Sequence, residues 1–335
     1  MTASSFGSAP QTGSRALRHR LGKLLRHGDT PWSAILVAMA LLVFALVVAL
    51  GLSVWRESAA TRALFGWNFI APTSASSWDP VNDRFSAWPI ITGTLTTALV
   101  AIALATPVSL FIAIFLAELC PAWLRGPLNF MIEMLAAVPS VVYGLWGIFV
   151  FLPGVVQPVG AFLGRSLGFL PLFAGTIPAS GISRLGAGLI LTIMIVPTIT
   201  AVSRDVLLAI PRAQREAALA LGSTYWEMIS QVLIPYGLSG ILGAVILGLG
   251  RALGETMAVT MVIGNNTVES SGSLLKPGAT LASVIANEFA EAVTKLHTSA
   301  LIQLGLVLFG MTLLLNIGAR LLVWRVSRTL ATEGR

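Results

Sequence analysis

Charged residues are scarce in this chain. Asp, Glu, Lys and Arg make up 10% of its 335 residues, whereas hydrophobic residues make up 56%. A soluble domain carries about 25% charged residues. Several uncharged runs also exceed the roughly 18 residues that mark a candidate transmembrane helix. The composition therefore excludes a soluble protein with a large core and predicts a polytopic membrane protein.

Cysteine and histidine are almost absent, with one cysteine (Cys120) and three histidines in the sequence. A single cysteine cannot form a disulfide within the chain. A metal site built from clustered cysteine and histidine is not expected either. The sequence also lacks the G-x-x-x-x-G-K-[ST] loop that binds nucleotide phosphates. We therefore expect no metal site, no catalytic residues and no ATP hydrolysis by this chain itself.

The chain carries a formal net charge of +7. In a soluble protein that charge would indicate a nucleic-acid partner. Here the basic residues gather at the boundaries of the apolar runs, where they indicate membrane topology. Residues 1–29 are rich in Ser and Gly and then in Arg and Lys. We expect them to form a cytoplasmic tail that lies on anionic membrane lipid, and we expect no nucleic acid as a partner.

The apolar runs predict six transmembrane helices and therefore an all-α fold. Four prolines follow the third run, at positions 153, 158, 171 and 178, and their density argues against another straight helix there. For residues 153–182 we expect instead an external or re-entrant cap with short helices. The predicted helices cover residues 32–55, 88–117, 129–152, 184–204, 237–263 and 298–323.

The distribution of lysine and arginine predicts orientation, because short cytoplasmic segments carry the excess of basic residues. Successive segments between the predicted helices lie on alternate sides of the membrane. The segments assigned to the inside hold 13 of the 21 basic residues and those assigned to the outside hold 7, while Arg251 lies within a predicted helix. We therefore expect a multi-pass protein of the cell (inner) membrane with both termini in the cytoplasm. The inside segments are 1–29, 118–128, 204–236 and 320–335, and the outside segments are 56–84, 153–184 and 264–296.

The segment between the fourth and fifth predicted helices differs from an ordinary loop. It reads EAALALG at positions 216–222 and continues as an apolar stretch to Pro235. Helical spacing holds on both sides of Gly222, and glycine tolerates the positive φ of a tight turn. The pattern predicts two short helices joined at Gly222. By itself it fits an amphipathic hairpin on the membrane surface equally well.

This segment resembles the EAA loop of permease subunits of ABC importers, which serves as a coupling helix seated in a groove of a separate ATPase. Two further stretches, LAAVPSVVYGLWG at 135–147 and GRALGETMAV at 250–259, resemble the PstC-type permeases of phosphate-specific (Pst) importers. They match the sister PstA type less well. The resemblance covers residues 75–325 approximately. The residues that it assigns to coupling with the ATPase are Glu216, Ala217, Ala218, Gly222 and Pro235.

The resemblance implies the type I ABC importer permease (MetI-like) fold and a translocation pathway for phosphate. It implies a PstA-like sister permease, two copies of a PstB-like ATPase and an extracytoplasmic PstS-like phosphate-binding protein. ATP and Mg would be used by the ATPase, with no cofactor bound by this chain. The expected organisation is a tail (1–29), a first transmembrane helix with its external loop (30–84), a permease core (85–325) containing the coupling loop (209–236), and a cytoplasmic C-terminal tail (326–335).

Three alternatives remain open. One is an ABC importer permease for another oxyanion, such as molybdate or sulfate. Another, of a different class, is a secondary transporter or channel that needs no ATP. The third is a membrane-anchored assembly or sensor protein without transport. Copurification of a nucleotide-binding subunit separates the first from the other two.

Arg251 and Glu255 lie near the middle of the fifth predicted helix. Arg251 follows Pro235 by 16 residues, or about 24 Å of helix, which places it at or beyond the middle of the bilayer. Each charge costs a few kcal/mol in lipid, so both must face protein or water. At positions i and i+4 they share one helix face and can form an ion pair. A structural ion pair between helices is one interpretation.

The other interpretation is a site for an anion. The planar guanidinium of Arg251 suits phosphate oxygens. Glu255 would pair with Arg251 in the empty site, or accept the proton of hydrogen phosphate. We expect Gly248, Gly250 and Gly254 to keep this face of the helix open. We therefore predict that Arg251 and Glu255 are the substrate-binding residues.

Overall fold

The computed structural model describes residues 29–72, 77–268 and 271–333. Within these ranges the regular elements are helices. Six of them are long and apolar enough to cross a membrane, which confirms the predicted all-α, six-helix membrane fold. Nearly all of the predicted N-terminal tail lies outside the described residues. The six helices are Trp32–Glu57, Trp88–Leu119, Ser140–Leu167, Arg184–Ala209, Tyr225–Gly254 and Lys295–Arg325.

The chain divides into two compact units, Met1–Ser53 and Val54–Arg335. The described part of the first unit belongs to α2 (Asp29–Glu57), which runs on into the second. Its large apolar side chains, such as Phe44 and Leu46, are exposed. A helix that is apolar all round suits a membrane span.

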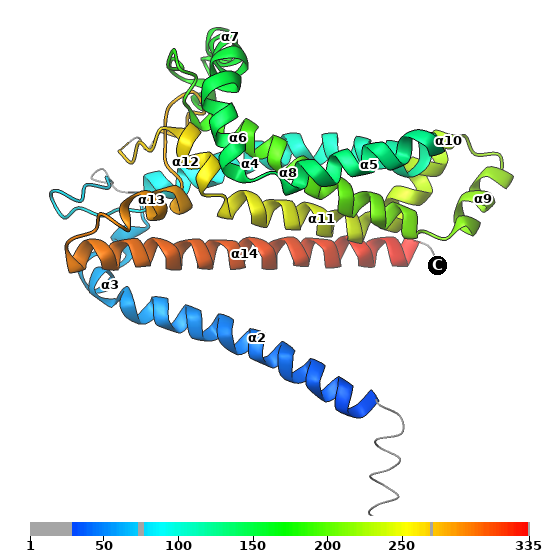
Figure 1. Ribbon diagram of the computed structural model, residues 1–335, viewed down its shortest axis with the longest axis horizontal. Helices are drawn as coiled ribbons and strands as arrows, with labels where there is room; N and C mark the ends of the chain where they lie inside the picture. The colour runs from blue at the N-terminus through cyan, green and yellow to red at the C-terminus, as the bar shows by residue number, and fades with distance from the viewer. Residues whose placement is uncertain (1–28, 73–76, 269–270, 334–335) are drawn as a thin grey trace, which may run out of the picture. The chain divides into compact units, whose positions relative to one another are not determined.

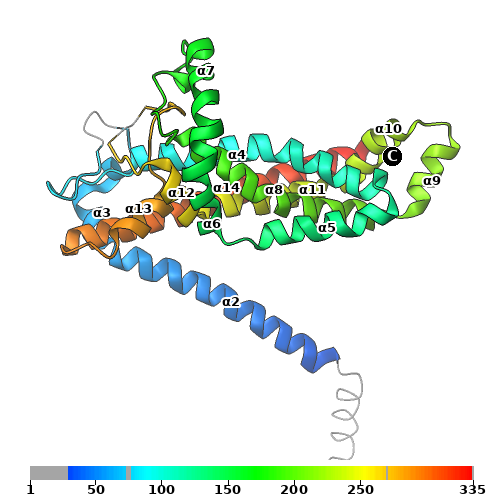
Figure 2. The ribbon, with the colours of Figure 1, turned by 45° about the horizontal axis from the view of Figure 1, so that its top comes forward.

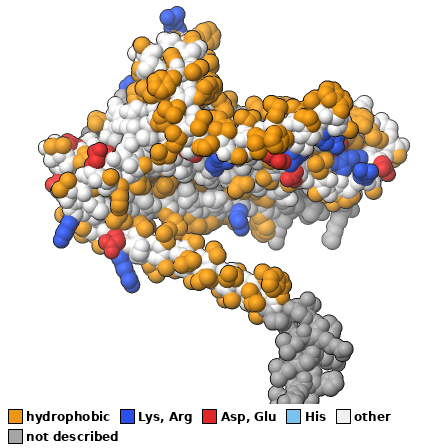
Figure 3. All heavy atoms as spheres, in the orientation of Figure 1, with side chains coloured by type: hydrophobic (Ala, Val, Ile, Leu, Met, Phe, Trp, Pro, Cys, Tyr) orange, Lys and Arg blue, Asp and Glu red, His pale blue; other side chains and the backbone are white. Residues whose placement is uncertain are grey.

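The second unit is a bundle in which α4 (Trp88–Ile114), α5 (Ala122–Ala137), α8 (Arg184–Ala209), α11 (Ile234–Gly254) and α14 (Lys295–Glu333) run side by side (Figures 1 and 2). The most deeply buried of these helices is α8. Its contacts with α4 and α11 hold most of the main apolar core. Apolar side chains cover most of the outer helix surface in Figure 3, as a surface facing lipid or partner helices requires.

Connecting segments gather at two opposite ends of this unit (Figures 1 and 2). One end, here called the α9 end, carries α9 (Arg212–Ala220) and α10 (Tyr225–Glu227). The other, here called the cap end, carries α7 (Gln157–Leu167), α12 (Met257–Ile263) and α13 (Leu281–Glu288). The described residues of 118–128 and 204–236 therefore lie at the α9 end, and those of 153–184 and 264–296 at the cap end.

The third predicted helix, 129–152, is wrong in its bounds. The chain instead forms α5, breaks at Val138 and Pro139, and continues as one helical run through α6 (Ser140–Trp146), the π-helical segment η3 (Gly147–Val156) and α7. The expectation of a cap with short helices over 153–182 holds only in part, because the helical run continues past Pro153 to Leu167 and the short helix η4 (Pro171–Phe173) follows it. Pro153 lies within the π-helical segment, whose wider turns relieve the clash of a proline ring with the preceding turn.

The fifth predicted helix, 237–263, is also shifted. The observed helical run begins at Tyr225, passes through Pro235 and ends at Gly254. Pro235 therefore does not end the coupling segment, because it follows the π-helical segment η5 (Met228–Leu233) and sits in the first turn of α11. A proline there loses no hydrogen bond that an α-helix needs.

The cap end is joined to the bundle by backbone hydrogen bonds. At the start of α8, the Arg184 N–H donates to Lys276 O (3.0 Å) and the Leu185 N–H donates to Leu274 O (2.8 Å). The Leu274 N–H in turn donates to Leu172 O (2.8 Å). Segments from three parts of the sequence are thereby held over one end of α8.

Candidate functional site

Arg251 lies within the bundle, near the end of α11. Its Nη1 donates a hydrogen bond to Thr198 Oγ1 at 3.1 Å. Thr198 lies near the middle of α8, so the guanidinium sits near the middle of the bundle. The prediction that Arg251 lies near the middle of the fifth helix is wrong, because the helical run that begins at Tyr225 ends at Gly254, three residues after Arg251. Among the described residues, the hydrogen-bond partner of the Arg251 guanidinium is a neutral hydroxyl.

A groove of about 620 Å³ opens in front of Arg251, between α8, α11 and α14. It contains a second arginine, Arg320 of α14, and no acidic residue is part of its lining. Two positive charges without a carboxylate make this groove suited to an anion, because guanidinium groups pair well with oxyanions. The lining residues are Thr198, Gly243, Ile246, Leu247, Gly250, Arg251, Asn316 and Arg320.

Glu255 does not pair with Arg251, contrary to the prediction. The helix that carries Arg251 ends at Gly254, and Glu255 has extended backbone angles (φ −68°, ψ 125°). The i, i+4 relationship therefore does not exist. Glu255 Oε1 instead accepts a hydrogen bond from the Ala258 N–H at 3.3 Å, at the start of α12. Glu255 follows Arg251 by four residues in the sequence, but it does not line the groove.

The three glycines near Arg251 behave differently from one another. Gly250 lines the groove, and a Cβ added to it or to Gly254 would meet nothing within 4 Å. This fits the predicted open face. A Cβ on Gly248, however, would come within 2.7 Å of the Ile199 side chain. That glycine permits close contact between α11 and α8.

The stretch at 135–147 contains the break between α5 and α6. Tyr143 Oη donates to Leu135 O at 2.9 Å and so bridges the break at Pro139. A Cβ on Gly144 would lie 2.6 Å from Met261 Sδ, so the glycine lets α6 approach α12. The motif thus determines how the chain changes direction between α5 and α6.

The α9 hairpin, residues 212–227, has the predicted turn at Gly222, but only its first helix is short, because the second continues from Tyr225 to Gly254. Gly222 has φ +86° and joins α9 to α10. Glu216 and Ala217 are exposed, whereas Ala218 is buried against the bundle. After the turn, Thr224 and Glu227 form a reciprocal capping box. The exposed face is therefore available for a partner while the opposite face is anchored.

Three large apolar side chains on this hairpin escaped the sequence analysis. Leu221 is 88% exposed, and Tyr225 and Trp226 are also exposed. They flank Gly222 at the turn of the hairpin. Neighbouring exposed apolar side chains on such a hairpin are typical of a protein contact. Their signal in the sequence was the apolar pair of Leu221 and Trp226 beside a turn glycine.

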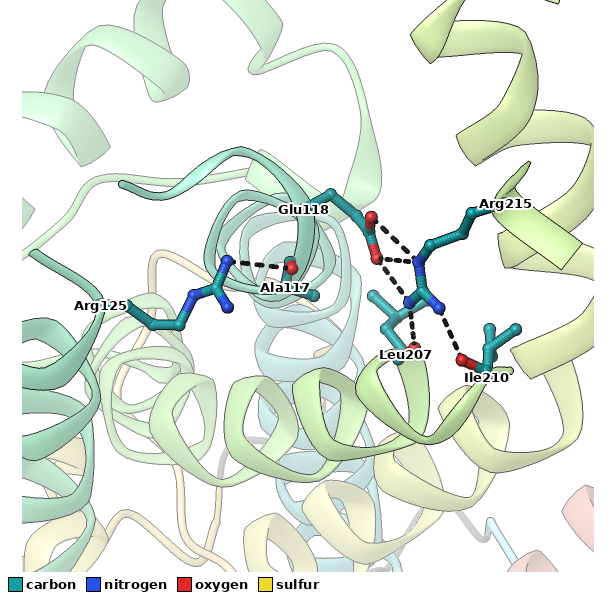
Figure 4. Close-up of polar contacts among 6 residues, drawn as sticks. All are labelled: Ala117, Glu118, Arg125, Leu207, Ile210 and Arg215. Carbon is teal, nitrogen blue, oxygen red and sulfur yellow. Dashed lines mark hydrogen bonds and ion pairs between the residues drawn. The ribbon is translucent and has the colours of Figure 1, made fainter. Parts of the chain in front are cut away.

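Arg215 connects the hairpin to the bundle (Figure 4). Its Nε and Nη2 both donate to Glu118, at 3.1 and 2.7 Å. Its other hydrogen bonds go to the carbonyls of Leu207 (2.8 Å) and Ile210 (2.5 Å) at the end of α8. The side chains of Arg215 and Glu118 are 17% and 8% exposed. The sequence analysis did not assign a role to either residue.

Comparisons with known proteins agree with this arrangement. The family model for the inner membrane component of binding-protein-dependent transport systems matches residues 109–328. The phosphate transport system permease protein PstC of Xylella fastidiosa is 46% identical over 294 residues, 87% of this chain and 89% of the relative. PstC of Pasteurella multocida is 43% identical over 327 residues, 97% of this chain and 98% of the relative. The chain belongs to the PstC family.

A solved structure supports the fold of this PstC-family chain. It is a bacterial alginate ABC transporter in complex with an alginate pentasaccharide-bound periplasmic protein. The match has a TM-score of 0.57 at 15% identity and covers 92% of this chain and 98% of that one. At that identity the likeness shows a shared ABC importer permease fold. It confirms the expected fold class of the chain.

Proposed function

We propose that this chain is the permease subunit of an ATP-driven phosphate importer. It forms the translocation pathway together with a PstA-like sister permease. The observation that carries the proposal is the 43% identity to a PstC protein along 97% of this chain. Because the aligned region spans nearly the whole chain, it contains the residues of both the groove and the α9 hairpin.

In this proposal Arg251 is the principal contact of phosphate during passage. Its position near the middle of the bundle and its neutral partner Thr198 support the assignment. Glu255 stays part of the proposed site, placed just beyond the end of α11, where it influences protonation or selectivity. The sister permease covers the groove, since arginines at membrane depth are tolerated only against protein, water or ligand.

The α9 end faces the cytoplasm, and both termini lie there. The excess of basic residues in segments that reach this end supports the orientation. The α9 hairpin, with Glu216, Ala217 and Gly222 on its surface, docks on one of two PstB-like ATPase subunits. Those subunits use ATP and Mg. A PstS-like protein delivers phosphate at the cap end.

Uptake in reconstituted vesicles tests the proposal. The complete complex should take up labelled phosphate only when ATP, Mg and the binding protein are supplied. Sulfate and molybdate in excess should compete poorly. Uptake without ATP would favour a secondary transporter or channel. Preferred uptake of sulfate or molybdate would keep the ABC class and change the substrate.

A further inference from the structure

The connection between α8 and α9 is short. Helix α8 ends at Ala209 and α9 begins at Arg212, with Ile210 and Pro211 between them. Both connecting residues have extended backbone angles, with ψ of 129° and 138°. An extended two-residue link by itself would let the angle between the helices change. Something further must hold α9 if its movements are to reach α8.

The Arg215 side chain supplies that connection. It donates to Leu207 O (2.8 Å) and Ile210 O (2.5 Å), in the last turn and at the cap of α8. Carbonyls at the end of a helix lack N–H donors within it, and a positive group there also interacts favourably with the helix dipole. Arg215 therefore folds back from α9 over the end of α8 and restricts the angle between them (Figure 4).

Glu118 orients this arginine and adds a third element. It lies in η2 (Phe115–Leu119), the π-helical turn that ends α4, and accepts hydrogen bonds from Arg215 Nε and Nη2. The carboxylate is 8% exposed. A buried ion pair adds little stability over apolar packing, because both charges lose their water. Its directional hydrogen bonds do, however, define one geometry for the ends of α4, α8 and α9.

The two arms of the α9 hairpin, before and after Gly222, are connected to the two helices whose side chains form the hydrogen bond between Arg251 and Thr198. The arm before Gly222 is held by Arg215 to α8, which carries Thr198. The arm after Gly222 continues through η5 into α11, which carries Arg251. Helices α4 and α8 are also joined along their length, where Ser109 Oγ donates to Val196 O at 3.2 Å. Relative movement of the arms therefore reaches the contact between Thr198 and Arg251.

We infer that Arg215 and Glu118 are positioning residues that join the α9 hairpin rigidly to the ends of α4 and α8. Through them a displacement of α9 by the ATPase becomes a displacement of α8 against α11 at the groove. The inference rests on the proposed function, since it needs an ATPase that moves α9. It predicts that loss of this ion pair uncouples ATP hydrolysis from transport while leaving both partners bound.

The test uses the reconstituted complex with the variants Glu118→Gln and Arg215→Gln. The phosphate transported per ATP hydrolysed should fall about fivefold or more, in the range of mutations that alter coupling, while the ATPase remains bound. Arg215→Lys should transport an intermediate amount of phosphate per ATP, because lysine keeps the positive charge but lacks the several N–H donors of the guanidinium. The matched control is Glu133→Gln. Its carboxylate lies 3.7 Å from Arg204 of α8, is 59% exposed, and belongs to α5 rather than α9.

A covalent bridge distinguishes a mechanical link from a need for the pair in folding. Glu118→Cys with Arg215→Cys, made together with Cys120→Ser, should assemble with a low transport ratio. A short bifunctional thiol reagent should then restore the ratio severalfold. Normal ratios in both Gln variants would overturn the inference, as would failure of the bridge to restore transport. If the unaltered complex takes up no phosphate with ATP, the proposed function fails instead.

Discussion

Arg251 on α11 and Thr198 on α8 are joined by a hydrogen bond of 3.1 Å. The partner is a neutral hydroxyl, so the bond orients the guanidinium without neutralising its charge. The groove beside it contains a second arginine and no carboxylate in its lining. A charge near the middle of a membrane bundle is costly when it is not compensated. In the proposed function, an anion in transit would provide that compensation.

Replacing Arg251 tests whether it binds the substrate. We expect Arg251→Met with Glu255→Leu to assemble but to lose phosphate uptake, because the double variant removes the charge that faces the groove. Arg251→Lys should keep reduced uptake, since it retains the charge without the bidentate fork. Uptake is measured at matched amounts of complex in the membrane. Near-normal uptake by the double variant would leave the arginine with a structural role.

Glu255→Gln should affect selectivity more than assembly. The carboxylate makes no ion pair with Arg251 and accepts a hydrogen bond from Ala258, which the amide oxygen of glutamine can also accept. The complex should therefore form normally. Competition by sulfate should increase, because the negative charge near the site is lost. Unchanged selectivity would separate Glu255 from the site.

Thr198→Val removes the hydroxyl that orients Arg251. A hydrogen bond to a charged group contributes about 1.5–3 kcal/mol, so uptake at low phosphate should fall on the order of tenfold. Thr192→Val on the same helix is the matched control, because the Thr192 hydroxyl donates to its own helix at Gly188 O. We expect that variant to keep normal uptake. Equal effects of the two substitutions would argue against a specific role for Thr198.

Gly222→Val should disturb the α9 hairpin by backbone strain. Gly222 has φ +86° and open space around it, so the cost comes from conformation rather than collision, at roughly 1–3 kcal/mol. ATPase binding and phosphate-stimulated ATP turnover should both decrease, while docking of the binding protein persists. Gly126→Ala, in open space on α5, serves as the control. Normal stimulated turnover in Gly222→Val would mean that the hairpin does not couple.

Thiol labelling tests the orientation. Val293, in the 264–296 segment at the cap end, is 94% exposed, and Leu221, beside α9, is 88% exposed. Val81 is 91% exposed and follows Trp78, whose Nε1 donates to Glu288 of α13 at the cap end. Cysteines placed at Val81 and Val293 should react in intact cells with a reagent that cannot cross the membrane. A cysteine at Leu221 should react only after permeabilisation. The reverse pattern would invert the topology. The native Cys120 is buried and should contribute little background.

Some local features of the structure follow from the sequence without knowledge of tertiary contacts. The α9 turn follows from Gly222, because glycine adopts positive φ without strain. The helix bounds were less predictable, since Pro153 and Pro235 are both accommodated by π-helical segments. Such wide turns depend on neighbouring packing and have no simple sequence pattern.

The sequence by itself determined that this is a six-helix membrane protein, because apolar runs of sufficient length have few other stable environments. It also determined, through its motifs, the family to which the chain belongs. Only the tertiary structure decided which groups meet. Glu255 parts from Arg251 because α11 ends between them, and Glu118 meets Arg215 across 97 positions of sequence. Periodicity describes one helix at a time, whereas ion pairs between helices depend on how the helices pack.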